Sequence, residues 1–265
     1  MKMLRLALFG LVLIGSTLVP SVSATSFSTD QSDLYYIQAE SGWGVQLVQR
    51  GSVIFATMFV YGPAGAPTWY VAAMQSVGNS MWTGDLFAAT GPWFGTVPFD
   101  PNAVMGRRAG TMTWTAQTLS TGTLAYVVDG VAVTKNVVRE TTATDDYSGT
   151  YLGALHLMAT NCTNPTDNAS GEIPFTTISV TQNGQSATLT MTILVLTLTI
   201  TGTVSQDGQF GTVAGTYTSS VGEAGNATVS AMNVQVNSLT ASFNLNSTNN
   251  GCQNSGYFAA MRSRP

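Results

Sequence analysis

The sequence predicts an all-β protein, and three observations indicate this class. Charged residues make up only 8% of the 265-residue chain, so long solvated helices are disfavoured. Segments rich in Thr and Val alternate polar with apolar residues, which is typical of strands. Beyond residue 24, no segment repeats its apolar residues with the 3.6-residue period of a helix. We therefore expect two antiparallel meander domains, the second of which is an up-and-down eight-stranded barrel.

The first 24 residues have the pattern of a secretory signal peptide. The basic residues Lys2 and Arg5 precede the apolar run Leu6–Val19, and small residues lead to a cleavage site after Ala24. A retained membrane anchor is the weaker interpretation, because this run is shorter than the roughly 20 residues that span a bilayer. We expect a secreted or periplasmic protein.

The charge balance argues against a nucleic-acid partner. Loss of Lys2 and Arg5 with the signal leaves seven basic and thirteen acidic side chains, a net charge of about −6. Phosphate recognition needs clustered Lys and Arg, and here only Arg107 and Arg108 are adjacent. The alternating segment 189–200 resembles a membrane-spanning strand, but the other strands lack a continuous apolar row, so no membrane insertion is expected.

The first domain is predicted at residues 25–140. Turn residues such as Asp129-Gly130 separate its segments. Strands are expected at 34–38, 43–50, 52–61, 67–75, 80–88, 109–117, 121–128 and 131–139. The strand at 52–61 is apolar on both faces, which is typical of a central strand.

A polar linker is predicted at residues 141–146, followed by the barrel domain at 147–265. Asn183-Gly184 and Asp207-Gly208 tolerate the positive φ angles of tight hairpin turns. The apolar phase shifts by one residue between 193 and 196, which predicts a turn or bulge there. Strands are expected at 147–158, 175–182, 185–193, 195–204, 209–218, 226–233, 235–246 and 252–262.

The chain contains two cysteines, Cys162 and Cys252. A disulfide between them is the favoured interpretation, since secretion places them in an oxidising compartment. The alternative is a reactive or metal-binding thiol, but neither cysteine has an adjacent His or a second Cys at ligand spacing.

All five tryptophans fall between Trp43 and Trp114. Aromatic rings spaced by turn residues grip sugars and other flat ligands, and they also fill the cores of small β-folds. Both a ligand-binding role and a core role for these rings therefore stay open. Because neighbours in a strand point to opposite faces, Trp69 and Tyr70 cannot share one platform. We expect Trp43 and Trp93 to be the most exposed of the rings, because they lie on turns. The candidate ligand-binding residues are Trp43, Trp69, Trp82, Trp93, Glu40 and Asp85, with Tyr70 and Gln46 nearby.

Two resemblances follow from these motifs. Four motifs in the first half carry the first resemblance: E-S-G-W-G at 40–44, P-T-W-Y at 67–70, W-T-G-D-L at 82–86 and G-P-W-F-G at 91–95. Together they resemble an uncharacterised module of secreted proteobacterial proteins. This resemblance implies an extracytoplasmic β-module and brings no activity. The second half contains the motifs S-G-T-Y at 148–151 and A-G-T-Y at 214–217. Through them, this half resembles the small barrels of lipocalins and avidins. That half has no tryptophan, so no biotin site is implied.

Catalytic and metal-binding patterns are weak. His156 is the only histidine, and no nucleophile motif accompanies it. A pair of carboxylates for glycoside hydrolysis would have to come from Glu40, Asp85 and Asp100, which lie near the aromatic residues in sequence. There is no His pair, no free Cys pair and no calcium-loop motif, so neither a metal nor another cofactor is expected.

The sequence thus predicts a secreted protein without catalytic function that binds a ligand or has a structural role. A glycan or cell surface is the expected partner of the aromatic residues in the first domain. The first alternative is a carrier of a small apolar ligand inside the second barrel, and the second is a glycoside-type hydrolase. The sequence predicts neither the ligand nor the oligomeric state.

Overall fold

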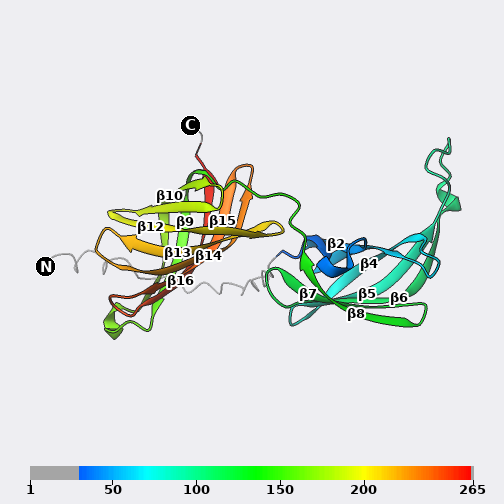
Figure 1. Ribbon diagram of the computed structural model, residues 1–265, viewed down its shortest axis with the longest axis horizontal. Helices are drawn as coiled ribbons and strands as arrows, with labels where there is room; N and C mark the ends of the chain where they lie inside the picture. Colours follow the sequence, from blue (N-terminus) through cyan, green and yellow to red (C-terminus); the bar gives the residue numbers. More distant parts are fainter. Residues whose placement is uncertain (1–29, 264–265) are drawn as a thin grey trace, which may run out of the picture.

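The computed structural model describes residues 30–263, so the predicted signal peptide lies outside the described residues. These residues form two closed antiparallel barrels that follow one another along the chain (Figure 1). Among them, no helix is long and apolar enough to cross a bilayer. The all-β prediction, with an up-and-down eight-stranded barrel in the second half, is confirmed.

In the N-terminal barrel, each strand pairs with its neighbours in sequence, and β1 closes the sheet against β8. The strands are β1 (Asp33–Tyr36), β2 (Gly44–Arg50), β3 (Val53–Tyr61), β4 (Pro67–Gly78), β5 (Met81–Thr90), β6 (Met105–Ala116), β7 (Thr121–Val128) and β8 (Val131–Arg139). Short 3-10 helices η1 (Gln38–Glu40) and η2 (Pro101–Ala103) lie in two of the connections.

The C-terminal barrel has the same meander, with β9 closing it between β10 and β16. Its strands are β9 (Gly149–Thr160), β10 (Ala169–Asn183), β11 (Ser186–Ile193), β12 (Leu196–Asp207), β13 (Phe210–Ser219), β14 (Ala224–Gln235), β15 (Ser238–Ser247) and β16 (Gln253–Arg262), and η3 (Pro165–Asp167) precedes β10. The predicted phase shift is a tight turn between Ile193 and Leu196, in which Leu194 has a φ of 53°.

Strand β3 shows how the two faces of the barrel wall differ. Ile54, Ala56 and Met58 point inward and are buried, while Phe55 and Phe59 point outward and stay exposed. The strand pairs with β2 and β4, but every strand of a closed barrel has two neighbours, so this pairing does not distinguish it as a central strand. However, nothing in the described chain covers its apolar outer face, which leaves aromatic rings at the surface of the barrel.

Each barrel has its own core of inward-facing side chains. In the N-terminal barrel, Trp82 and Trp114 are buried among aliphatic residues, and Trp114 lies 4.6 Å from the ring of Tyr35. The C-terminal core is a continuous cluster that includes Tyr151, Tyr217 and Phe258. Burial of such large apolar surfaces stabilises each barrel.

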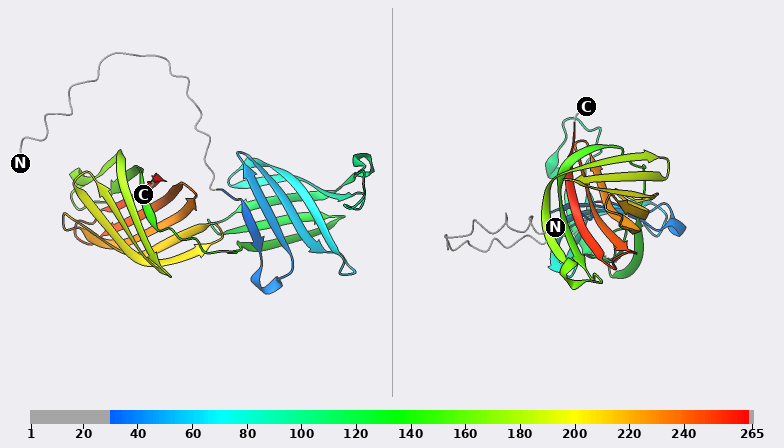
Figure 2. Two further views of the ribbon diagram at one scale, coloured as in Figure 1. Left: turned by 90° about the horizontal axis from the view of Figure 1, so that it is seen from above. Right: turned by 90° about the vertical axis from the view of Figure 1, so that its left-hand side faces the viewer.

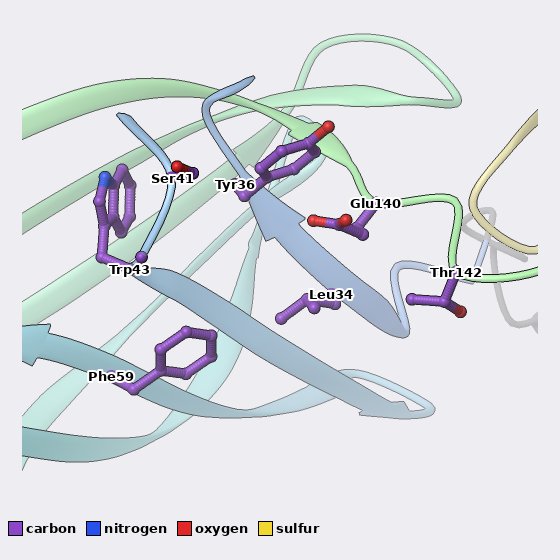
Figure 3. Close-up of a pocket in the computed structure, with 8 residues that line it drawn as sticks. Leu34, Tyr36, Ser41, Trp43, Phe59, Glu140 and Thr142 are labelled. Carbon is purple, nitrogen blue, oxygen red and sulfur yellow. The ribbon is translucent and has the colours of Figure 1, made fainter. Parts of the chain in front are cut away.

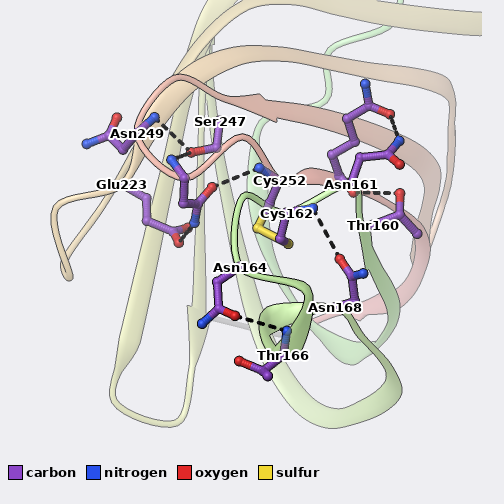
Figure 4. Close-up of a disulfide and its surroundings, with 12 residues drawn as sticks. Thr160, Asn161, Cys162, Asn164, Thr166, Asn168, Glu223, Ser247, Asn249 and Cys252 are labelled. Carbon is purple, nitrogen blue, oxygen red and sulfur yellow. Dashed lines mark hydrogen bonds between the residues drawn. A yellow bond between two sulfur atoms is a disulfide. The ribbon is translucent and has the colours of Figure 1, made fainter.

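Cys162 and Cys252 form the predicted disulfide, which joins the β9–β10 loop to the β15–β16 loop (Figure 4). Side-chain amides order both loops: Asn168 accepts a hydrogen bond from the main-chain N–H of Cys162 at 3.1 Å, and Asn250 accepts one from that of Cys252 at 3.0 Å. The bridge is compatible with an extracellular or periplasmic location.

The segment between β8 and β9 is held by the hairpins that the sequence predicts at Asn183-Gly184 and Asp207-Gly208. The residue before each turn, Gln182 or Gln206, uses its side-chain amide to bind this segment. Gln206 bonds to both the main-chain N–H and the carboxylate of Asp145, at 2.7 and 3.0 Å. Gln182 accepts a hydrogen bond from the N–H of Tyr147 at 3.1 Å. The predicted linker is therefore fixed at several points along its length.

Candidate functional site

The five tryptophans divide into core and surface residues. Trp82 is only 2% exposed and Trp114 is fully buried, whereas Trp69 and Trp93 are 50% and 68% exposed, and Trp43 is half-buried. The assignment of Trp82 to a binding surface is therefore wrong, because its place in the strand alternation points it into the core. Trp69 and its neighbour Tyr70 do point to opposite faces, as the alternation predicts.

A groove of about 310 Å³ lies on the outside of the N-terminal barrel, across β1 (Figure 3). One part of its wall comes from the loop before β2, another from the outer face of β3, and a third from the segment after β8. The residues that line it are Leu34, Tyr36, Ser41, Gly42, Trp43, Phe59, Glu140 and Thr142. Segments more than 100 positions apart in the sequence thus meet at one surface.

The groove exists because the sequence leaves β1 short. β1 ends at Tyr36, and the chain then leaves the sheet through η1 before it returns at Gly44. Glu140 closes the opposite side, since its N–H bonds to the carbonyl oxygen of Leu34 at 2.8 Å. The groove therefore has aromatic walls and is lined by one carboxylate and by the hydroxyl-bearing residues Tyr36, Ser41 and Thr142.

Trp43 is held in place by two charged residues. Its indole Nε1 donates to the Glu40 carboxylate at 3.1 Å, and the same carboxylate accepts from Lys135 Nζ at 2.6 Å. The ammonium group also lies 5.7 Å from the centroid of the indole ring, within the range of a cation–π interaction. Trp43 is consequently less exposed than its position on a turn predicts.

The hydrogen bond from Lys135 keeps the pKa of Glu40 below its ordinary value, so this carboxylate is charged at neutral pH. A charged Glu40 is a stronger acceptor for the indole N–H than a protonated one. The orientation of the ring therefore depends on the ionisation of a residue beside the groove. Sequence reasoning placed Glu40 near a ligand, and the structure gives it the role of orienting Trp43.

The aromatic surface continues beyond the groove along the barrel wall. Phe59 pairs in register with Trp69 on β4, and both rings point outward. Val71 on β4 pairs with Thr57 and with the exposed Phe87 on β5. A row of rings and aliphatic groups therefore extends from the groove across three neighbouring strands.

The carboxylates proposed for hydrolysis lie on different parts of the surface. Glu40 lies beside β1 and β8, while Asp85 points outward from β5, which is opposite β1 in the order of the barrel. Asp85 pairs with Arg108 at 2.7 Å, and this bond lowers the pKa of Asp85. Asp100 caps η2 by accepting the N–H of Asn102. Each of these carboxylates thus has a different partner, and none of the three lines the groove, as paired-carboxylate chemistry at that surface requires.

His156 lies on the outer wall of the C-terminal barrel. Its ring stacks on Tyr257 at 5.3 Å and its Nδ1 lies 2.8 Å from the carboxylate of Glu172. No nucleophile joins this group in the contacts of the described chain. Residues 30–263 also contain no cluster of three His, Cys, Asp or Glu side chains that could hold a metal ion.

The C-terminal barrel gives less support to ligand binding than the groove does. Its interior is occupied by a continuous cluster of buried side chains from all eight strands and from Tyr147 just before β9. A carrier needs an apolar interior with space left over for the ligand. The packing of these side chains favours a filled barrel.

No protein-family model matches the chain, and no curated protein sequence is significantly similar to it. Of the residues that line the groove, sequence reasoning selected only Trp43. Tyr36, Phe59 and Glu140 were missed because each comes from a different strand or loop, and only closure of the barrel brings them together.

Proposed function

We propose that this protein is an extracytoplasmic binding protein that recognises carbohydrate in the groove formed by Tyr36, Trp43, Phe59 and Glu140. The observation that carries the proposal is an aromatic groove at the surface with hydrogen-bonding groups on its rim. A volume of about 310 Å³ lies at the lower end of the range for small-molecule sites and suits one or two sugar rings.

A sugar ring has a C–H face that packs against aromatic rings and a rim of hydroxyl groups that need hydrogen-bond partners. In the groove, Tyr36, Trp43 and Phe59 offer the aromatic surface. Glu140, Ser41 and Thr142 offer acceptors and donors for hydroxyl groups. The open shape fits the end or the side of a glycan chain, and Phe59 leads to Trp69, where a longer chain would continue.

Preorganisation strengthens the proposal. The Glu40–Lys135 pair fixes Trp43 before any ligand arrives, so binding would cost little side-chain entropy at that ring. The buried disulfide and the negative charge of the chain are compatible with an extracytoplasmic site of action.

Calorimetric titration of the purified protein with a panel of neutral and acidic oligosaccharides tests this function. Replacement of an aromatic residue at the centre of a binding site costs about 2 kcal/mol, so Trp43→Ala should weaken glycan affinity roughly 30-fold. Trp93→Ala is the matched control, because Trp93 is also exposed but lies in the β5–β6 loop. Equal affinities for both variants, or no glycan binding by the wild type, would contradict the proposal.

A further inference from the structure

Strands β5 and β6 extend beyond the N-terminal barrel as a projecting arm, formed by residues 88–90, the loop 91–104 and residues 105–107. The two strand ends remain paired with each other, from Ala88 with Arg107 to Thr90 with Met105. Residues 105–107 are all exposed, so this part of the ribbon has left the barrel wall. The arm points away from the C-terminal barrel (Figures 1 and 2).

The tip of this arm is apolar and open to solvent. Phe94 and Val97 are 89% and 92% exposed, and the ring of Trp93 lies 5.3 Å from that of Phe94. Large apolar side chains at this exposure mark an interaction site in a soluble protein. The exposed apolar residues of the arm are Trp93, Phe94, Val97, Phe99, Val104 and Met105.

The loop has a defined internal structure. The N–H of Thr96 bonds to the carbonyl oxygen of Trp93 at 2.9 Å, which closes a turn at the tip. Asp100 caps η2 through the N–H of Asn102 at 2.9 Å. The backbone of the loop is therefore held by local hydrogen bonds, while its large apolar side chains stay exposed.

Charge is distributed along the arm in a consistent order. The sequence from Leu86 to Phe99 contains no charged residue. At the base of the arm, Arg107 forms a two-point ion pair with Asp129, and Arg108 pairs with Asp85. All four of these side chains remain about half exposed. An uncharged tip is therefore followed by a ring that carries both signs of charge.

We propose that this arm docks the protein onto a zwitterionic phospholipid surface, with Trp93, Phe94 and Val97 inserted among the headgroups. The distribution of charge along the arm matches the layers of such a surface. The uncharged tip suits the boundary between headgroups and acyl chains. The two guanidinium and two carboxylate groups at the base suit headgroups that carry both phosphate and ammonium. This docking is independent of the glycan groove, which lies across β1 on the opposite side of the barrel.

Sedimentation with phosphatidylcholine vesicles tests the proposal. The purified two-barrel protein should sediment with the vesicles, and the emission of Trp93 should shift to the blue and be quenched by brominated acyl chains. The double variant Trp93→Ala/Phe94→Ala should partition at least roughly tenfold less, because it loses two large apolar side chains. The control is Trp69→Ala, which removes an exposed ring from the barrel wall.

Both variants change exposed side chains, so their thermal unfolding should match that of the wild type. Three results would overturn the proposal. The first is no sedimentation with vesicles. The second is sedimentation only when the vesicles contain anionic phosphatidylglycerol, with its loss in high salt. The third is self-association of the protein that the double variant abolishes, which would make a second copy of the chain the partner of the arm.

Discussion

The guanidinium group of Arg139, the last residue of β8, lies 4.9 Å from the ring centroid of Phe210, the first residue of β13 in the other barrel. The same group lies 5.1 Å from the ring of Tyr35. It also donates hydrogen bonds to the carbonyl oxygens of Asp30, Ser32 and Leu119 and to the carboxylate of Asp33. One buried cation thus joins the end of the first barrel to the start of a strand in the second.

Replacement of Arg139 should destabilise the protein strongly. The side chain is fully buried, so its loss removes a charged donor from Asp33 and from three carbonyl groups. Loss of one partner from a buried ion pair costs about 3–5 kcal/mol, and we expect a decrease of this size in the free energy of unfolding of Arg139→Ala. Arg108→Ala, which removes an exposed ion pair, should lower the free energy of unfolding far less in the same denaturant titration. Similar costs for the two variants would contradict this account of the junction.

The hairpin turn at Gly208 offers a test of the contact between the barrels. Gly208 and Gly184 occupy equivalent turns with φ of 59° and 58°. A Cβ at Gly184 meets nothing within 4 Å, whereas one at Gly208 would collide with the carboxylate of Asp33. Each Ala substitution should cost about 1–2 kcal/mol for the left-handed backbone, and Gly208→Ala should cost more.

The additional cost at Gly208 should appear at the junction. Proteolysis within residues 140–148 should be faster in Gly208→Ala than in Gly184→Ala. A displaced hairpin would lose two hydrogen bonds, from the Gln209 N–H to Asp33 and from the Gly208 N–H to Thr141. Equal cleavage rates would show that the hairpin does not hold the barrels together.

The environment of Trp43 should depend on pH through Glu40. The hydrogen bond from Lys135 lowers the pKa of Glu40 below its ordinary value of 4.5. The contact is therefore complete above about pH 4.5 and is lost as the pH falls through the lower pKa of the folded state. Trp43 emission should change over that acidic range in the wild type and not in Glu40→Gln. The variant Asp85→Asn should keep the pH transition of the Trp43 emission. Loss of the transition in Asp85→Asn would contradict its assignment to Glu40.

The disulfide should stabilise one barrel only. The bridge closes a loop of 90 residues within the C-terminal barrel, and loop-closure entropy predicts a contribution of about 4–5 kcal/mol. In calorimetry, the double variant Cys162→Ser/Cys252→Ser should lose stability in the transition of the C-terminal barrel. The transition of the other barrel is the internal control, and an equal decrease in both would mean that the barrels unfold as one unit.

The sequence was sufficient to predict most of the fold, because binary patterning and turn residues are local signals. The phase shift near residue 194 and the Asn-Gly and Asp-Gly dipeptides located turns that the structure contains. The structure extends β5 to Thr90 and begins β6 at Met105, so both strands are longer than the sequence predicts. The additional residues lie past the barrel, where burial no longer imposes an alternating pattern.

The candidate site was predictable only in part, for a physical reason. Alternation shows that Trp69 and Tyr70 face opposite ways, but it does not show which face is inside. Strand β3 has apolar residues on both faces, so nothing in its pattern distinguishes Phe59 at the surface from Met58 in the core. The approach of Glu140 to Tyr36 depends on the pairing of β1 with β8, a contact across 100 residues.

The measurement that tests the central claim most directly is a two-dimensional ¹H–¹⁵N NMR titration of the five tryptophan indole N–H signals with an oligosaccharide that binds. We predict that the Trp43 signal shifts most and that of Trp69 shifts less, while the signals of the buried Trp82 and Trp114 and of Trp93 on the arm stay unchanged. A titration in which the Trp43 signal does not move while the ligand binds would contradict the assignment of the groove as the glycan site.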